Sequence, residues 1–319
     1  MFKLFSGIQP SGEIHIGNYV GALKQWVELQ NKYESIFSIV DYHAITVDYN
    51  PAEMQEKILD VAKDLIAVGI DPQKSTLFVQ SHRPEHTELA WILNTITTMG
   101  ELSRMTQYKE KSAKHQEKVG LFDYPVLQAA DILIYKAEAV PVGEDQVQHV
   151  ELARTLAQRF NSKFKKIFPE PKEILVEGAR VLGLDGKGKM SKSNSPDTYI
   201  GINDQPDLIR KKISTAVTDQ GNDPEISNGT KNLIGLMGIF AGKEAEEKYM
   251  AERRAGTIKY SDLKPALADV IIKHLEPIQK RRAELSDKEV RKVLADGAKR
   301  LAPSAAHTIK EVKSALGLI

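Results

Sequence analysis

The sequence predicts an α/β fold in which a doubly wound parallel sheet is followed by a C-terminal all-helical domain. Two observations carry this prediction. Strand and helix signals alternate through the first 190 residues, and the strand signals stop after residue 205. Such alternation is typical of a parallel sheet covered by helices on both faces. A chain of 319 residues is also long enough to form two domains.

The individual elements follow from local patterns. Buried strands are expected at Phe2–Ile8, Ile36–Tyr42, Thr76–Gln80 and Ala139–Val142. Between them, helices are expected from near residue 18 and over 51–69, 84–98 and 144–160. Further helices are expected over 208–216, 231–240, 263–285 and 287–301, the last with a capping box of Ser286 and Glu289. We expect a catalytic domain over 1–200, with a helical insertion at about 50–120, and a helical domain over 201–319.

Composition narrows the class of protein. Apolar residues make up 41% and charged residues 27% of the chain, as in ordinary globular proteins. The absence of cysteine excludes disulfides, thiolate catalysis and cysteine-ligated metal centres. No apolar run approaches membrane-spanning length and no secretory leader pattern is seen, so a cytoplasmic protein without a membrane partner is expected. The net charge of +1 hides a mild basic excess over 201–319, which permits a nucleic-acid surface there.

Two short strings carry the functional signal: PSGEIHIGN at 10–18 and KMSKS at 189–193. His15 can donate a hydrogen bond to a phosphate oxygen, and Gly17 lets a nucleotide approach the backbone near a helix start. Lys189 and Lys192 can follow the charge that builds up as pyrophosphate leaves. Together the strings predict a site that acts on the α-phosphate of a nucleoside triphosphate. Singly, they are also compatible with a histidine that caps a helix and with a solvated loop.

With these strings the chain resembles the class I aminoacyl-tRNA synthetases and, within them, the bacterial-type tryptophanyl-tRNA synthetases. The strings GIQPSG at 7–12, YPVLQAADIL at 124–133 and GEDQ at 143–146 share in the resemblance, which spans the whole chain. It implies a Rossmann-like catalytic domain of the HIGH/KMSKS type and an anticodon- or tRNA-binding role for the helical domain.

The resemblance also implies which residues act on ATP. His15, Lys189 and Lys192 are expected to be catalytic. The expected ATP-binding residues are Gln9, Pro10, Ser11, Gly17 and Asn18, the ribose-binding Gly143, Glu144 and Asp145, Val181 through its backbone, Met190, Ser191 and Ser193, and Lys109 and Lys111 in a charged segment. The acidic residues could also cap the N-terminus of the helix expected over 144–160, a role that can hold at the same time as ribose binding, and the charged segment could be a solvated face.

Asp131 is the residue expected to recognise the amino acid. It lies in an apolar helix, where a carboxylate without a donor would be costly, and an indole offers one N–H. A structural aspartate satisfied by a neighbouring group is the alternative. By resemblance, Gln146, Phe5, His43 and Gln128 share this pocket. His43 could instead be a core histidine, and Gln128 stands where many relatives have methionine, so that its amide needs a partner, such as Asp131.

The implied reaction is activation of L-tryptophan with ATP and Mg²⁺, followed by transfer to tRNA(Trp). No metal site made by the protein alone is expected, and a homodimer is implied by the family. Three alternatives stay open: a tyrosyl-tRNA synthetase, a catalytically silent paralogue that binds RNA, and a small-molecule nucleotidyltransferase.

Overall fold

The structure is a computed structural model that describes residues 2–106, 118–175, 181–192 and 194–319. These residues fall into two compact units that are interleaved along the chain. The first comprises Met1–Gly12, Gln25–Val176 and Leu285–Ile319, and the second comprises Glu13–Lys24 and Glu177–Glu284. The sequence predicted a single boundary near residue 200, whereas the last helix belongs to the first unit and the segment around residue 15 to the second.

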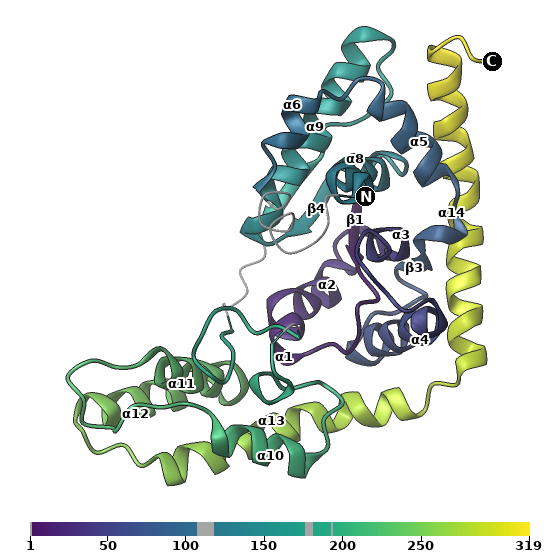
Figure 1. Cartoon of the computed structure of the whole chain (residues 1–319). Coiled ribbons are helices and arrows are strands. Elements are labelled where there is room, and N and C mark those ends of the chain that lie inside the picture. Colours follow the sequence, from purple (N-terminus) through teal and green to yellow (C-terminus); the bar gives the residue numbers. More distant parts are fainter. Residues whose placement is uncertain (1, 107–117, 176–180, 193) are drawn as a thin grey trace. The chain divides into compact units, whose positions relative to one another are not determined.

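The first unit contains a five-stranded parallel sheet in the order β3-β2-β1-β4-β5 (Figure 1). The strands are β1 Lys3–Ile8, β2 Glu34–Ile39, β3 Thr76–Val79, β4 Ala139–Val142 and β5 Lys172–Leu175. This order reverses between β1 and β4, and ligands of doubly wound sheets bind at the carboxyl ends of the strands at such a point. The predicted fold class is therefore confirmed.

Several helices and turns accompany the sheet in the first unit. They are α3 Asp41–Ala44, α4 Pro51–Val68, the 3₁₀ turn η2 Gln80–His82, α5 Glu85–Asn94, α6 Met99–Ser103, α8 Val119–Leu133, the 3₁₀ turn η3 Glu144–Gln146, α9 Val147–Lys163 and α14 Asp287–Ala315. Successive side chains along a strand point to opposite faces of the sheet and pack into different cores. Phe5, Ile36 and Phe78 pack with α5, α8 and α9, whereas the ring of Phe37 stacks on that of Trp26 at 4.9 Å.

Helix α14 lies along the edge strand β3 (Figure 1). A Cβ atom at Gly297 would lie 2.0 Å from the carbonyl oxygen of Leu77, so only glycine allows this approach. Arg300, one turn further on, donates to the carbonyl oxygens of Pro72 and Ser75. The helix extends through Pro303 well past the predicted end at residue 301, and its predicted capping box is present.

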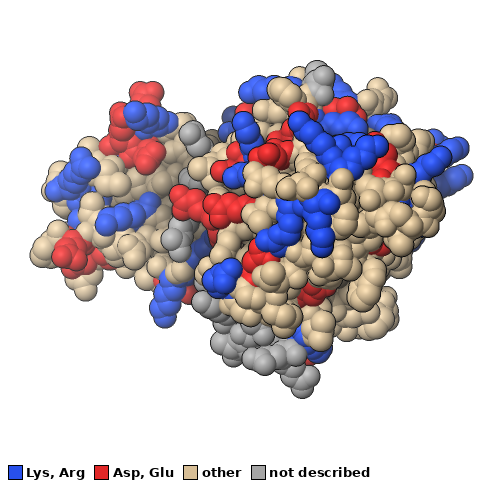
Figure 2. Space-filling view, turned by 90° about the horizontal axis from the view of Figure 1, so that it is seen from above, with Lys and Arg blue, Asp and Glu red and all other residues tan. Residues whose placement is uncertain are grey.

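The second unit is mainly helical. Its elements are α1 Ile16–Asn18, the π-helical turn η1 Tyr19–Leu23, the 3₁₀ turn η4 Pro196–Thr198, α10 Pro206–Thr215, α11 Asn228–Ala241, α12 Lys243–Arg254 and α13 Tyr260–Ala283. Helix α2, Lys24–Leu29, continues from η1 and belongs to the first unit from Gln25 onward. On the face of the molecule shown in Figure 2, acidic and basic side chains are interspersed, as the near-neutral net charge leads one to expect.

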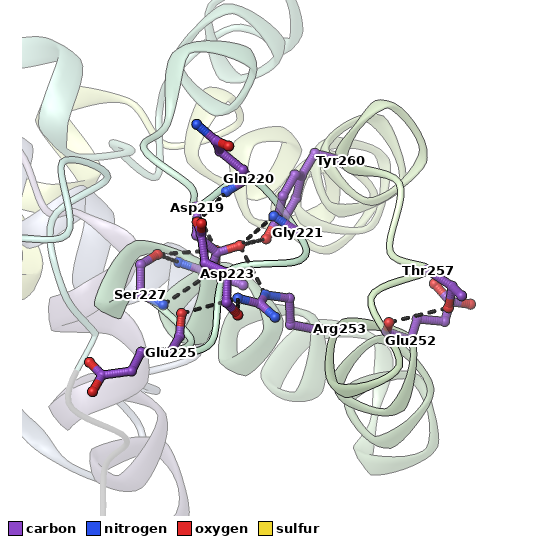
Figure 3. A network of polar contacts seen from close by, with 11 residues as sticks. Asp219, Gln220, Gly221, Asp223, Glu225, Ser227, Glu252, Arg253, Thr257 and Tyr260 are labelled. Carbon is purple, nitrogen blue, oxygen red and sulfur yellow. Dashed lines mark hydrogen bonds and ion pairs between the residues drawn. The ribbon is translucent and has the colours of Figure 1, made fainter.

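A buried polar network joins the helices of the second unit. Arg253 of α12 and Tyr260 of α13 both donate to the carboxylate of Asp219, which also accepts the backbone N–H groups of Gly221 and Ser227 (Figure 3). The side chains of Asp219 and Arg253 are each 4% exposed. Because the two side-chain donors come from different helices, this carboxylate fixes the connection between α10 and α11 to both α12 and α13.

Candidate active site

The first signature string forms the start of a helix in the second unit. His15 pairs with Gly201 in an antiparallel bridge, and the backbone N–H of Ile16 donates to the carbonyl oxygen of Ile200 at 2.9 Å. His15 also caps α1: its Nδ1 accepts the backbone N–H of Asn18 at 3.2 Å, and the Asn18 side chain accepts the N–H of His15. The capping interpretation of this histidine is thus correct, and it uses only one nitrogen of the ring.

The cap determines which nitrogen can act on a ligand. A backbone N–H can only donate, so Nδ1 of His15 carries no proton and the neutral ring bears its proton on Nε2. Burial lowers the pKa of His15 to about 4, with further lowering by the positive charges of Lys192 and Lys189. At neutral pH the ring is therefore an uncharged donor through Nε2, which suits a hydrogen bond to a phosphate oxygen.

The second string packs directly on the first. A Cβ atom at Gly17 would lie 3.3 Å from the Cβ of Met190 and 3.0 Å from Nδ1 of His15, so the glycine permits a close contact within the protein itself. The loop is held as a short hairpin, because Leu182 bridges Lys189 and the N–H of Met190 donates to the carbonyl oxygen of Val181 at 2.9 Å.

A side chain from helix α11 holds this hairpin. Oδ1 of Asn232 accepts the backbone N–H of Leu182 at 2.9 Å, and its Nδ2 donates to the carbonyl oxygen of the same residue at 3.0 Å. Asn232 is buried. The sequence did not point to this residue, because a polar position within an apolar helix gives no indication of the distant backbone that it binds.

The expected ATP-binding residues are distributed over both units. His15, Gly17, Asn18, Val181, Lys189, Met190, Ser191 and Lys192 belong to the second unit, whereas Gln9, Pro10 and Ser11 follow β1 in the first. Gly143, Glu144 and Asp145 follow β4, also in the first unit. Ser193, Lys109 and Lys111 lie outside the described residues.

Asp131 forms the centre of a buried polar cluster in the first unit. Its side chain is 1% exposed. Oδ1 accepts hydrogen bonds from Nε2 of Gln80 at 2.7 Å and from Nδ1 of His86 at 2.6 Å, and Oδ2 accepts one from Nε2 of His43 at 2.7 Å. Burial raises the pKa of Asp131, but the charges and hydrogen bonds of the two histidines outweigh it, so the net shift is downward. The carboxylate is ionised at neutral pH.

These partners refine the interpretation of the pocket. Three side chains donate hydrogen bonds to Asp131: His43 of α3, which follows β2; Gln80 of η2, which follows β3; and His86 of α5. Gln128, the partner suggested by the sequence, is not among these donors. A carboxylate has about four lone-pair positions, so three donors leave room for another. The buried-aspartate alternative and a ligand-binding role are therefore compatible, and His43 is both a buried histidine and a neighbour of the carboxylate.

Aromatic rings surround this cluster. The His43 ring lies edge-on to that of Tyr124 at 6.2 Å, and Phe5 stacks on Tyr135 at 6.1 Å. The hydroxyl of Tyr124 lies 3.0 Å from Nε2 of His149. Burial, with a contribution from the charge of Asp145, raises the pKa of Tyr124 to about 12. The Tyr124 hydroxyl therefore stays protonated and can serve as a neutral polar group.

The Gly143–Gln146 segment follows β4 at the point where the strand order reverses. Glu144–Gln146 form a 3₁₀ turn, and Nε2 of Gln146 donates to Oδ2 of Asp145 at 2.9 Å. Helix α9 begins only at Val147 and has no side-chain cap or acidic residue in its first turn. The 3₁₀ turn runs directly into α9, and Glu144 and Asp145 are the acidic residues of this 3₁₀ turn. The acidic helix start expected from the sequence is therefore present, and the exposed carboxylate of Asp145 is compatible with both interpretations.

Gln80, His86, Tyr124 and His149 were not singled out by the sequence. One signal could have indicated Gln80, since it directly follows the apolar run of β3, and polar residues at the carboxyl ends of parallel strands meet at one edge of the sheet. The role of His86 depends on the packing of α5 against α8. No local pattern predicts that contact.

Metal-binding clusters and membrane spans are both absent from the part of the chain that the structure describes. In the described ranges, no group of three or more histidine, aspartate or glutamate side chains is arranged to hold a metal ion. None of the helices within those ranges combines the length and apolar character that a membrane span requires.

Comparison with known proteins places the chain in a family. Residues 1–276 match the family described as "tRNA synthetases class I (W and Y)". The tryptophan–tRNA ligase of Caldanaerobacter subterraneus subsp. tengcongensis is 49% identical over 100% of this chain and 99% of its own length. That of Helicobacter pylori is 45% identical over 99% of both chains.

A solved structure agrees with these relatives. Tryptophanyl-tRNA synthetase from Campylobacter jejuni, crystallised in complex with ADP and tryptophan, superposes with a TM-score of 0.87 at 34% identity and covers 99% of each chain. The matched family, the full-length relatives and the packing of the two signature strings agree with one another. The chain therefore belongs to the class I aminoacyl-tRNA synthetases of the tryptophan and tyrosine group.

Proposed function

We propose that this chain is a tryptophan–tRNA ligase, which activates L-tryptophan with ATP to tryptophanyl-adenylate and pyrophosphate and then transfers tryptophan to tRNA(Trp). The observation that carries the activation step is the direct packing of the two signature strings, with Gly17 against Met190 and the charges of Lys192 and Lys189 acting on His15. The relatives of similar length support tryptophan as the amino acid.

Adenylate formation requires little covalent chemistry from the protein. A carboxylate oxygen of tryptophan attacks the α-phosphorus in line, the bond to the bridging oxygen breaks, and pyrophosphate leaves with the electron pair. Because the nucleophile is already an anion, no general base is needed. Nε2–H of His15 is proposed to donate to a phosphate oxygen, while Lys189 and Lys192 stabilise the charge that develops on the leaving group.

The remaining ATP contacts are assigned by segment. Gln9, Pro10, Ser11, Gly17 and Asn18 are proposed to surround the phosphates, Gly143, Glu144 and Asp145 to bind the ribose, and Val181 to contact adenine through its backbone. Met190, Ser191 and Ser193 are proposed to complete the loop, and Lys109 and Lys111 to approach the nucleotide. The position of Asp145 after β4 supports the ribose assignment, since ligands of such sheets bind at strand ends.

Asp131 is proposed to accept the indole N–H of tryptophan. Its ionised carboxylate is fixed by three donors, and a site that hydrogen-bonds a substrate N–H rejects analogues that lack it far better than apolar packing can. Phe5, His43, Gln128 and Gln146 are proposed to line the same pocket. The tyrosine-specific alternative is disfavoured, because relatives that are 49% and 45% identical over 99% of their own length are tryptophan–tRNA ligases.

Mg²⁺ is proposed to arrive with ATP rather than to occupy a site of its own in the protein. This small cation prefers oxygen ligands and commonly binds through substrate phosphates, with few ligands from the protein. Bound to the triphosphate, the ion would neutralise charge on the leaving group. The protein's own contribution is made by His15 and the two lysines.

We further propose that the protein acts in the cytoplasm and binds tRNA through its helical region. We also propose that it forms a homodimer, and exposed apolar side chains support this last proposal. Trp91 of α5, Met99 of α6 and Val119 of α8 are 71%, 71% and 80% exposed. Helices α5 and α6 both pack against α8, so that large apolar side chains are presented by one group of helices. Burial of such side chains against a second copy would remove apolar surface from water. Sedimentation of the wild type and of Trp91→Glu would test this assignment.

Amino-acid-dependent exchange of labelled pyrophosphate into ATP tests the proposed function. The assay is run separately with each standard amino acid, and exchange with tryptophan alone is expected. Charging of tRNA(Trp) would then be measured with labelled tryptophan. Exchange with tyrosine would transfer the assignment to the tyrosine enzyme. Absence of exchange with every amino acid, from folded protein that binds ATP, would favour a silent paralogue or another nucleotidyl acceptor.

A further inference from the structure

Helix α10 carries a buried lysine that none of the roles proposed above uses. Nζ of Lys212 lies 2.7 Å from Oδ2 of Asp204, and the two side chains are only 5% and 6% exposed. Removing two charges from water is costly, and replacement of such a pair by apolar groups is often neutral or stabilising. Stability is therefore a poor explanation of this ion pair, and its neighbours indicate what it holds in place.

The first neighbour leads to the backbone of His15. Oδ2 of Asp204 also accepts the backbone N–H of Gly201 at 2.9 Å, and Gly201 is the bridge partner of His15. On either side, the N–H of Ile16 donates to Ile200 and the N–H of Ile202 donates to Ile14, both at 2.9 Å. The carboxylate therefore fixes the short backbone segment that pairs with the first signature string.

The second neighbour leads to the side chain of His15. Nζ of Lys212 lies 4.8 Å from the centroid of the Tyr199 ring. The Tyr199 ring in turn lies 6.0 Å from the His15 ring. The lysine thus reaches the histidine by two routes, one through the backbone of the bridge and one through neighbouring rings.

Helix α13 fixes the same segment from another direction. Nε2 of Gln279 donates to the carbonyl oxygens of Ile202 and Asp204, at 2.9 Å and 3.0 Å. Two helices therefore hold the short segment 199–204, which carries the bridge to His15 and directly follows the turn after the lysine loop.

We propose that Lys212 and Asp204 are positioning residues for adenylate formation, which hold the His15 ring where Nε2–H meets the phosphate. This inference rests on the proposed function. Neither residue touches a substrate, and both act through Gly201 and Tyr199. A displacement of about 1 Å in a group that contacts the reacting centre can cost a factor of about 100 in rate. The buried pair is thus retained for the geometry that it imposes on the site.

Steady-state pyrophosphate exchange on the full chain provides the first test. Lys212→Met removes the charge and keeps most of the stem, and Tyr199→Leu removes the ring without leaving a buried charge unpaired. We expect both to lower kcat at least about tenfold and to leave KM for tryptophan within about twofold. Lys211→Met makes the same chemical change at the adjacent, exposed position of α10 and should match the wild type.

A double-mutant cycle distinguishes positioning from general destabilisation. Asn can replace His15 as a helix cap, so His15→Asn removes the imidazole donor while keeping α1 capped. In that background, Lys212→Met should cost less than about threefold. An equal loss in both backgrounds, or no loss in either, would overturn the proposal. If Lys212→Met does not fold, the double variant Asp204→Asn/Lys212→Met removes both charges and is tested in its place.

Titration of the His15 ring by NMR gives a readout that does not depend on catalysis. In the wild type its pKa is about 4, against an ordinary value of 6.5. Loosening of the segment in Lys212→Met and Tyr199→Leu should admit water and raise this pKa toward the ordinary value. An unchanged titration in both variants would refute the link. If the wild type activates no amino acid, the proposed function fails, and this titration still decides whether Lys212 positions His15.

Discussion

Asp131, in the last turn of α8, and Tyr135, two residues beyond the end of that helix, are joined by the ring of His86. Nδ1 of this ring lies 2.6 Å from Oδ1 of Asp131, and Nε2 lies 2.7 Å from the Tyr135 hydroxyl. The side chain of His86 is completely buried. The carboxylate expected to recognise the indole is therefore anchored on the side of Oδ1 by groups that have no access to solvent, and Oδ2 has His43 as its partner.

Replacement of Asp131 by Asn should abolish recognition of the indole N–H. The wild type should prefer tryptophan by at least about 100-fold in kcat/KM over the analogue in which sulfur replaces that N–H, because the analogue leaves the carboxylate without its donor. Asp131→Asn should reduce this preference to a few-fold. Asn is chosen because Ala would also leave His86 and Gln80 unpaired, at about 1–3 kcal/mol for each buried group. Tyr135→Phe alters the far end of the same chain of hydrogen bonds and serves as the comparison. A preference that survives in Asp131→Asn would remove this residue from the pocket.

Lys192→Ala should slow adenylate formation severely and leave tryptophan affinity nearly intact. The positive charge of Lys192 lowers the pKa of His15, so the two side chains act in the same part of the site. The proposed role of Lys192 is to stabilise the charge that develops in the transition state. A loss of about 100- to 1,000-fold in the single-turnover rate is expected from removal of one such group. Lys187→Ala, at an exposed position before the same loop, is the control and should behave as the wild type. An unchanged chemical step in Lys192→Ala would contradict the assignment.

Stability should fall between pH 6.5 and about 4 in a manner that depends on His15. The pKa of this ring is about 4 in the folded chain and 6.5 ordinarily, so the unfolded chain binds more protons in this interval. The stabilising contribution is complete above the ordinary pKa and is lost as the pH falls toward 4, at up to about 1.4 kcal/mol for each pH unit between the two values. Urea unfolding of the wild type and of His15→Asn at several pH values isolates the effect. Parallel pH dependences for the two proteins would show that His15 does not titrate as described.

Gly297→Ala should destabilise the first unit by about 1–3 kcal/mol, since the added methyl group would collide with the backbone of β3 and force α14 away. Gly235→Ala is the matched control. A Cβ at that position in α11 meets no atom within 4 Å, and replacement of a helical glycine by alanine stabilises by about 0.5–1 kcal/mol. Urea midpoints of the two variants should therefore move in opposite directions, and a shift of the same sign in both would refute the close-packing argument.

The sequence predicted the elements whose signals are local. The helix from Pro51 ends at Val68, directly before the predicted stop at Gly69, and β4 has the predicted bounds. β5 was missed because the edge strand Lys172–Leu175 is half-exposed and has little apolar pattern. α12 was missed for a similar reason, since most residues of Lys243–Arg254 are charged and the apolar pattern is weak.

The residues of the candidate site likewise fall into those that a local sequence signal indicates and those that it does not. The two strings were recognisable from their residue types, and Asp131 from the cost of a carboxylate in an apolar helix. The residues that hold them were not recognisable: Asn232, Gln80 and His86 act on segments 50, 51 and 45 residues away along the chain. Such contacts depend on how helices and strands pack. The predicted catalytic domain over 1–200 and helical domain over 201–319 stay predictions about function, since the compact units of the structure have other bounds.

The contact between Gly297 and Leu77 also bears on solubility. An edge strand presents backbone groups that can pair with a strand from another molecule, and proteins commonly block this with a covering element or with charged residues. The two edges of this sheet use different means. β3 lies beneath α14, whereas β5 begins with Lys172 and Glu173. A chain shortened before α14 would therefore expose β3, and we expect it to aggregate by strand addition even where the remaining sheet still folds.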